Sequence, residues 1–145
     1  MSAPEQELLD AAEAVMARAY APYSGYCVGA AIRDEKGRIW TGCNVENISY
    51  GVTICAERSA LAALVSGGSA LVTAVAVVTR DGGTPCGMCL QALLEFSPEP
   101  SSVAVYTASP GAPAKAWTLA ELLPHAFRSD AVSRTIDGSS DVEQD

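Results

Sequence analysis

Cysteine and glutamate residues stand at the start of two apolar stretches that are expected to be helices. One stretch begins with "CAE", Cys55 to Glu57, and the other contains "PCGMC", in which Cys86 and Cys89 are three residues apart. Side chains three apart share one face of a helix, so both sulfurs can reach one point. The unpaired N–H groups and the positive dipole of a helix start favour thiolate over thiol. Cys55, separated from this pair by one expected strand, can supply a third sulfur.

Three thiolates form a soft ligand set that suits Zn²⁺. A structural zinc site usually has four protein ligands, but the local count here stops at Cys55, Cys86 and Cys89, which leaves a position for water. Zinc lowers the pKa of such a water towards neutrality. Glu57 can accept the released proton and pass it to a substrate. Arg58 can donate a hydrogen bond to a ligand sulfur and offset part of the negative charge. The pattern therefore predicts a catalytic zinc centre.

Three simpler interpretations stay open at this point. A single cysteine is most often a small buried apolar residue, a lone C-x-x-C can be a redox pair, and a structural zinc could take a distant fourth ligand. The five cysteines are odd in number and do not suggest a disulfide framework. The two cysteine elements at two helix starts, with a strand between them, favour catalytic zinc over each alternative.

The elements that must position these residues follow from hydrophobic periodicity and turn residues. The sequence predicts helices over residues 5–20, 55–67, 85–96 and 118–124 and strands over residues 26–34, 38–47, 70–80 and 101–108. Gly37 suits a hairpin turn between the first two strands, and Pro85 suits the first turn of the third helix. Thr118 and Glu121 have capping-box spacing. Alternating strands and helices predict an α/β domain with parallel pairing, hence a mixed sheet with helices on its faces.

Charge and composition limit the partners and the location. The chain has 145 residues and a formal net charge of −8, which argues against a nucleic-acid partner and favours a small neutral or cationic substrate. No apolar run approaches the ~20 residues of a membrane span, and the acidic start lacks a secretory pattern. We therefore expect a cytoplasmic protein with no membrane partner. One domain is expected over residues 1–127, followed by a polar, acidic tail over 128–145 that we expect to be partly disordered.

The sequence resembles the zinc-dependent cytidine deaminases. The similarity runs from "YAPYSGYCVGAA" through "GCNVENISYGVTICAERSA" and "PCGMCLQALLEF" to "LAELLPHAF", and it is closest in kind to the small homotetrameric branch that acts on free nucleosides. The resemblance implies a three-layer fold with a five-stranded mixed sheet flanked by helices. It also implies that Cys55, Cys86 and Cys89 hold Zn²⁺ and that Glu57 carries protons between water and substrate.

Five further positions match substrate-binding residues of that family. By resemblance, Asn44 and Glu46 in "GCNVEN" hold the ribose hydroxyls, Tyr26 packs near the base, and Ala56 offers backbone groups to the pyrimidine edge. Phe127 matches an aromatic residue that reaches the site of a neighbouring subunit. Considered alone, Asn44 and Glu46 would be solvated loop residues, Tyr26 a core residue, and Phe127 a core or interface residue.

The resemblance implies hydrolytic deamination of cytidine and 2′-deoxycytidine to the uridine and ammonia. One position departs from the family pattern, because Leu90 stands where P-C-x-x-C is usually followed by arginine. A modified cytosine nucleoside, such as an N4-substituted cytidine or a nucleoside antibiotic, therefore remains an alternative substrate. A structural zinc-binding module is the alternative from another class. Arg80 and Asp81, which no motif includes, are interpreted as a solvated turn.

Overall fold

A five-stranded mixed sheet with the strand order β2-β1-β3-β4-β5 forms the centre of the molecule. Only β3 and β4 pair in parallel, and the other neighbours are antiparallel. The computed structural model describes residues 1–128, so the predicted tail lies outside the described residues except for Arg128. The strands are β1 (Val28–Asp34), β2 (Ile39–Cys43), β3 (Val72–Thr79), β4 (Ala104–Ala108) and β5 (Lys115–Thr118).

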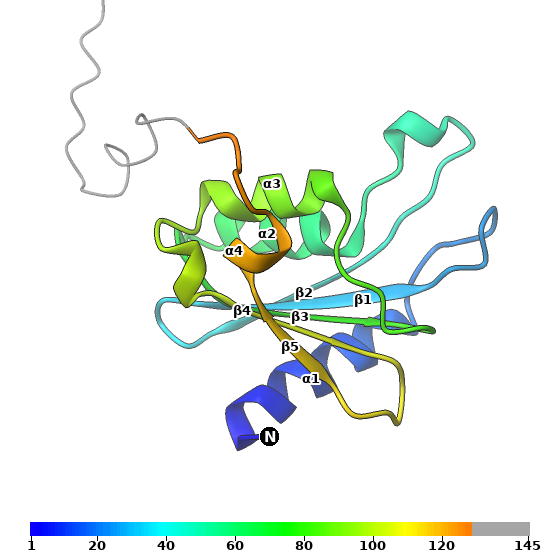
Figure 1. The fold of residues 1–145 in the computed structure, drawn as a ribbon. Coiled ribbons are helices and arrows are strands. Elements are labelled where there is room, and N and C mark those ends of the chain that lie inside the picture. Colours follow the sequence, from blue (N-terminus) through cyan, green and yellow to red (C-terminus); the bar gives the residue numbers. More distant parts are fainter. Residues whose placement is uncertain (129–145) are drawn as a thin grey trace, which may run out of the picture.

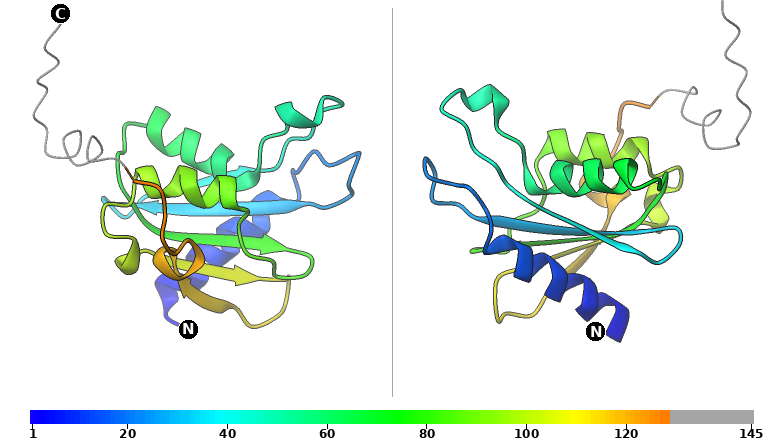
Figure 2. Two further views of the ribbon diagram at one scale, coloured as in Figure 1. Left: turned by 45° about the horizontal axis from the view of Figure 1, so that its top comes forward. Right: turned by 180° about the vertical axis from the view of Figure 1, so that it is seen from behind.

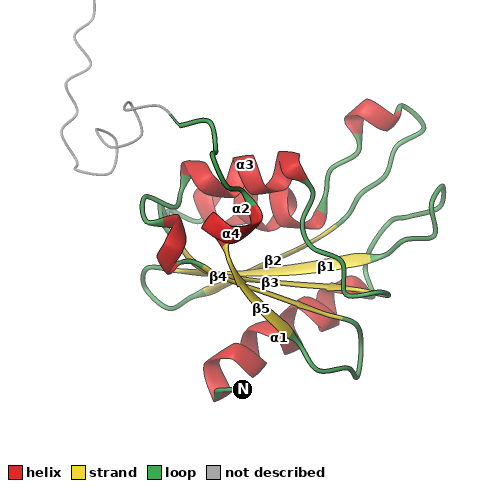
Figure 3. Cartoon of the chain, viewed as in Figure 1, coloured by secondary structure: helices red, strands yellow, loops and turns green. Residues whose placement is uncertain are grey.

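Helices cover both faces of this sheet (Figures 1 and 3). Helix α1 (Ala3–Met16) packs on one face, and α2 (Ala56–Ser66), α3 (Gly87–Glu95) and the short α4 (Leu119–Leu122) lie on the other. Two 3₁₀ turns, Tyr50–Val52 and Pro100–Ser102, interrupt the connections. The predicted α/β class, with a mixed five-stranded sheet between layers of helices, is confirmed.

The central strand β3 explains why the sheet is buried on both faces. Val75 and Val77 join the apolar cluster beneath α2 and α3, while Ala76 and Val78 join the cluster beneath α1. Successive side chains of a strand point to opposite faces, so the valine-rich run fills both cores at once. At Gly29 an added Cβ would lie 1.9 Å from the carbonyl oxygen of Ala12 in α1. Glycine at this position therefore lets the helix backbone approach the sheet.

Several predicted boundaries differ from the structure. Helix α1 runs over Ala3–Met16 rather than 5–20, because Ser2 and Glu5 form its capping box at the earlier position. Pro85 does not lie in the first turn of α3, since Cys86 is the N-cap and the helix begins at Gly87. The sequence periodicity did not predict β5. Only the family resemblance implied a fifth strand. The capping box of Thr118 and Glu121 forms as predicted.

The topology also corrects the predicted strand pairing and explains where the helix starts lie. Strands β2 and β3 run in the same direction but do not pair, because β1 lies between them and is antiparallel to both. Helices α2 and α3 follow β2 and β3, so both begin at the same end of the sheet, where β1 also begins (Figure 2). That end carries the segments 17–27 and 44–55, which are joined by hydrogen bonds such as Glu46 N–H to the Tyr20 carbonyl at 2.8 Å.

Candidate metal centre and adjoining cavity

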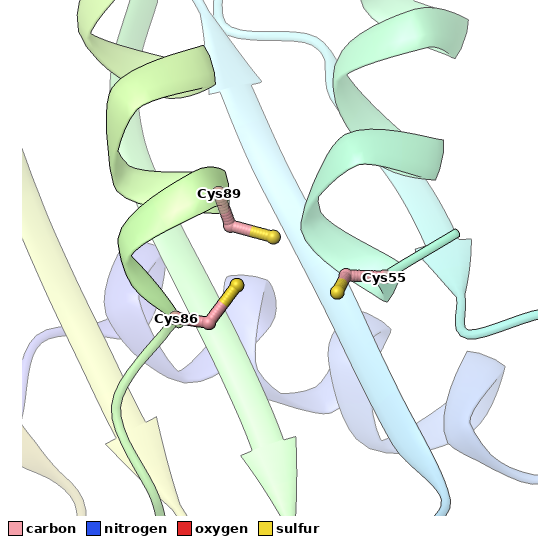
Figure 4. Close-up of side chains that lie close together, drawn as sticks. All are labelled: Cys55, Cys86 and Cys89. Atoms are coloured by element: carbon pink, nitrogen blue, oxygen red, sulfur yellow. The ribbon is translucent and has the colours of Figure 1, made fainter. Parts of the chain in front are cut away.

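Three sulfurs converge where α2 and α3 begin (Figure 4). The Sγ atoms of Cys55, Cys86 and Cys89 all lie within 4.8 Å of one another. Cys55 is the N-cap of α2, Cys86 is the N-cap of α3, and Cys89 lies in the first turn of α3. Neither N-cap side chain caps a backbone N–H group of its own helix. Both sulfurs therefore remain available to a metal ion.

This donor set fits one zinc ion. Zn–S bonds are about 2.3 Å long and zinc is tetrahedral, so two sulfurs on one ion lie about 3.8 Å apart. A small inward movement of the three sulfurs is enough to share a single ion. The cluster consists of sulfur alone among the residues the structure describes, and thiolate sets of this kind select Zn²⁺ over magnesium or calcium.

One cysteine of the cluster, Cys55, is already biased towards thiolate. Hydrogen bonding from the Cys89 thiol, with help from Arg58, lowers the pKa of Cys55 to about 5. The same contact with Cys55, together with burial, raises the pKa of Cys89, because that thiol is the partner that keeps its proton. The first proton of this pair therefore leaves easily.

Arg58 is the cation beside the cluster. Its Nη2 donates to Cys55 Sγ at 3.8 Å and to the Thr53 carbonyl oxygen at 3.3 Å. Its Nε is buried without a hydrogen-bond partner among the described residues. Leu90 is 5% exposed and packs in the core beneath α2 and α3. Leu90, which stands where the family usually has arginine, thus contributes apolar contact and no charge.

Glu57 is a buried carboxylate next to the sulfurs. It is 5% exposed. Burial raises the pKa of Glu57, and the nearby Cys55 charge raises it further, while hydrogen bonds from its own N–H and the Cys89 thiol oppose the shift only in part. A carboxyl group in such surroundings readily holds a proton. The position and environment of Glu57 suit it to proton transfer.

A cavity of about 320 Å³ opens beside the sulfurs. Seven of the residues predicted for the site line it: Tyr26, Asn44, Glu46, Cys55, Ala56, Glu57 and Cys86. Ser24, Thr79 and Thr84, which the sequence analysis did not single out, line it as well. The cavity therefore connects the predicted metal ligands to the predicted substrate-binding residues.

Asn44 and Glu46 are held firmly at this cavity. The Asn44 amide accepts from Val28 N–H at 2.9 Å and donates to the Tyr26 carbonyl at 2.7 Å. The Glu46 carboxylate accepts from the N–H groups of Tyr23 and Ser24 at 2.9 and 3.1 Å and from the Ser24 hydroxyl. The Ser24 hydroxyl lowers the pKa of Glu46, followed by these N–H groups. Each side chain retains hydrogen-bonding capacity for a ligand, and neither is a freely solvated loop residue.

Tyr26 is held by two residues that the sequence analysis set aside. Its hydroxyl donates to Asp81 Oδ1 at 2.5 Å, and the Arg80 guanidinium carbon lies 5.0 Å from the ring centroid. Arg80 and Asp81 are thus not merely a solvated turn. The contact depends on the antiparallel pairing of β1 with β3, which no local sequence pattern reveals.

Phe127 does not reach this cavity within one chain. Its side chain is 82% exposed, and its carbonyl oxygen accepts from Gln91 Nε2 at 3.0 Å. The predicted contact of Phe127 with a neighbouring subunit stays a prediction. So do the individual roles of the cavity-lining residues.

Comparison with known proteins agrees with this geometry. The family model described as "Cytidine and deoxycytidylate deaminase zinc-binding region" matches residues 2–106. A cytidine deaminase of Mycobacterium tuberculosis is 42% identical over 120 residues, covering 81% of this chain and 85% of the relative. One of Halalkalibacterium halodurans is 43% identical over 122 residues, covering 81% and 91%. The crystal structure of cytidine deaminase from Burkholderia pseudomallei superposes with a TM-score of 0.79 at 38% identity, covering 88% of this chain and all of that one.

Proposed function

This chain belongs to the cytidine and deoxycytidylate deaminase family, and on that premise we propose that it deaminates cytidine and 2′-deoxycytidine hydrolytically. The products are uridine or 2′-deoxyuridine and ammonia. The observation that carries the proposal is the meeting of three sulfurs with buried Glu57 at one cavity. Zn²⁺ is the cofactor, and Cys55, Cys86 and Cys89 are its proposed ligands. When bound there, Zn²⁺ acts as a Lewis acid that lowers the pKa of a water molecule.

Glu57 is the proposed proton carrier of the reaction. Its carboxylate takes a proton from the attacking water and delivers it to N3 of the cytosine ring as water adds at C4. It then takes the proton of the new hydroxyl group on C4 and delivers it to the exocyclic nitrogen, so that the C4=O bond forms as the C4–N bond breaks and ammonia leaves. The burial that raises the pKa of Glu57 favours the protonated form needed for these deliveries. Arg58 offsets thiolate charge through its contact with Cys55.

Charge at the cavity favours a nucleoside over a nucleotide. Among the described residues that line it, none is lysine or arginine, while Glu46 and Glu57 are carboxylic acids. A 5′-phosphate would meet no cation there and would lie near the ionised Glu46. Asn44 and Glu46 are proposed to bind the sugar hydroxyls, with Tyr26 and Ala56 around the base. Leu90 does not line the cavity.

Assembly into a homotetramer is part of the proposal. Several large apolar side chains are exposed, among them Ile48, Tyr50, Val52, Met88 and Phe127. Exposed apolar side chains of this kind suit contact with further copies of the chain. Light scattering at micromolar concentration tests it, and a monomeric mass would contradict it.

A cytoplasmic location is also proposed. The described residues form no helix long and apolar enough to cross a membrane. A centre of free thiols suits the reducing cytosol. Fractionation of cells that express the tagged chain would test the location.

The decisive experiment is deamination with and without zinc. The purified protein is incubated with cytidine, 2′-deoxycytidine, an N4-substituted cytidine and 2′-deoxycytidine 5′-phosphate, and ammonia release and ultraviolet change are followed. We expect turnover of the two free nucleosides, its loss after chelation, and its return with Zn²⁺ but not Mg²⁺. Stoichiometric zinc without turnover of any cytosine compound would support a structural module instead. Turnover of the N4-substituted compound alone would assign the alternative substrate.

A further inference from the structure

We propose that Asp81 is a positioning residue for substrate binding, which acts by holding Tyr26 as a wall of the cavity. The inference rests on the proposed function and assigns a role to a residue outside the family motifs. Asp81 does not itself line the cavity, whereas Tyr26 does. Its effect on a nucleoside must therefore pass through the tyrosine.

The strand register brings the two residues together. Strands β1 and β3 are antiparallel, and Val28 pairs with Thr79. Tyr26, just before β1, and Asp81, in the turn just after β3, therefore leave the sheet at the same end. The side-chain hydrogen bond between them joins the two segments across 55 residues of sequence.

Three donors converge on one oxygen of Asp81. The Tyr26 hydroxyl donates to Oδ1 at 2.5 Å, the Thr79 hydroxyl at 3.0 Å, and the Gly83 N–H at 3.2 Å. A Cβ added at Gly83 would lie 3.3 Å from both Asp81 Oδ1 and the Tyr26 hydroxyl. Glycine at this position lets the turn close around the hydrogen bond. Hydrogen bonding from Tyr26 and Thr79 lowers the pKa of Asp81, which keeps the acceptor ionised.

This arrangement fixes the tyrosine ring on two sides. Asp81 binds its hydroxyl, and Arg80 lies over the ring at 5.0 Å without lining the cavity. The same turn leads directly into Thr84 and Cys86, which do line the cavity. Asp81 therefore links the aromatic wall to the segment that carries a proposed metal ligand. A tyrosine held in this way presents its ring to a base without first losing rotamer freedom on binding.

The test separates binding from chemistry in the zinc-loaded protein. We expect Asp81→Ala to raise KM for cytidine about 3- to 10-fold, the size of one lost hydrogen bond. We expect kcat to change by less than about two-fold, because the lost contact serves ground state and transition state alike. Uridine binding, measured by calorimetry, should weaken by the same factor. Asp81→Asn keeps the acceptor oxygen and should restore most of the affinity.

A double-mutant cycle with Tyr26→Phe tests the route of the effect. Tyr26→Phe keeps the ring and removes only the hydroxyl, so Asp81→Ala should weaken uridine binding no further in that background. Equal weakening in both backgrounds would overturn the proposal, as would unchanged KM in Asp81→Ala. Glu13→Ala is the control, because it also removes one negative charge. Glu13 is exposed on α1, which packs on the face of the sheet opposite α2 and α3, and the substitution should leave KM unchanged. If the wild type deaminates no cytosine nucleoside, the proposed function fails on its own.

Discussion

A buried carboxylate lies near each end of helix α2, and the pKa values of the two groups are shifted in opposite directions. Glu57 in the first turn is 5% exposed, and Asp34, beside the residues that follow the helix, is 1% exposed. The pKa of Glu57 is raised, whereas the pKa of Asp34 is held well below its usual range. Both side chains are nearly inaccessible to solvent, so low exposure alone does not decide the protonation of either group.

Hydrogen-bond donors account for the difference. Burial would raise the pKa of Asp34, but donors outweigh it: the Ser69 hydroxyl, the Trp40 indole, and the N–H groups of Lys36 and Arg38. The Arg38 guanidinium adds an ion pair at 2.9 Å. At Glu57, its own N–H, the Cys89 thiol and the Arg58 charge lower the pKa, but they do not outweigh burial. A carboxylate surrounded by donors fixes the fold, while one with few donors remains available for proton transfer.

Replacing Glu57 should remove chemistry and spare the fold. We expect Glu57→Gln to lower kcat for cytidine about 10²- to 10⁴-fold, the usual contribution of a positioned proton carrier. Zinc content and melting temperature should not fall, because the amide has the same shape and is easier to bury than a carboxylate. Steady-state kinetics, metal analysis and thermal unfolding measure the three quantities. Turnover near the wild-type level would contradict the assignment of Glu57 to proton transfer.

Replacing Asp34 should lower the stability of the fold and leave the chemistry intact. We expect Asp34→Asn to lower the free energy of unfolding by about 1–3 kcal/mol at pH 7, since buried charged hydrogen bonds are lost. Catalytic parameters at 25 °C should stay at the wild-type level. Denaturant unfolding against Asp10→Asn, an exposed control on α1, measures the effect. A loss of activity without a loss of stability would contradict the assignment of Asp34 to the fold.

The pH dependence of stability tests the contribution of ionised Asp34 to the fold. The pKa of Asp34 is lower in the folded chain than the unfolded value of about 3.9, so its stabilisation is complete above about pH 5. It is lost progressively as the pH falls below about 4. The difference in stability between the wild type and Asp34→Asn should therefore shrink between pH 5 and pH 3. A difference that stays constant over this range would exclude Asp34 as its source.

Substitution of Gly67, at the end of α2 near Asp34, has the smallest expected effect on the free energy of unfolding. A Cβ added there would lie 2.0 Å from the Trp40 ring, which is held in place by its bond to Asp34 and by Arg38 at 5.2 Å. We expect Gly67→Ala to destabilise the fold by about 1–2 kcal/mol through this crowding. Gly51→Ala, where a Cβ meets nothing within 4 Å, is the matched control. Equal melting temperatures for both variants would show that Trp40 moves aside freely.

The sequence predicted elements with strong periodicity and missed those that depend on distant partners. The valine-rich run of β3 was recognisable because it fills both cores. The strand β5, "KAWT", has four residues and is stabilised by pairing with β4, a contact that no local pattern reports. Parallel pairing of strands joined by a helix, as the alternation predicted, holds for β3 and β4 but not for β2 and β3, because β1 inserts between them.

The same distinction applies to the site. The sulfurs of Cys55, Cys86 and Cys89 could be expected to meet because helix starts after parallel strands share one edge. Asp81 could not be linked to Tyr26, because the contact depends on the register of β1 against β3. Family motifs do not supply that register, and only the folded chain shows it.

The N-caps of α2 and α3 carry a consequence for how the chain matures. Helix starts are normally closed by serine, threonine or aspartate side chains, but here the two positions are cysteines that cap nothing. We therefore expect the chain to reach its final rigidity only after metal uptake, when one ion on the three proposed ligands ties both helix starts together. Zinc supply would then set how many molecules resist proteolysis as well as how many are active.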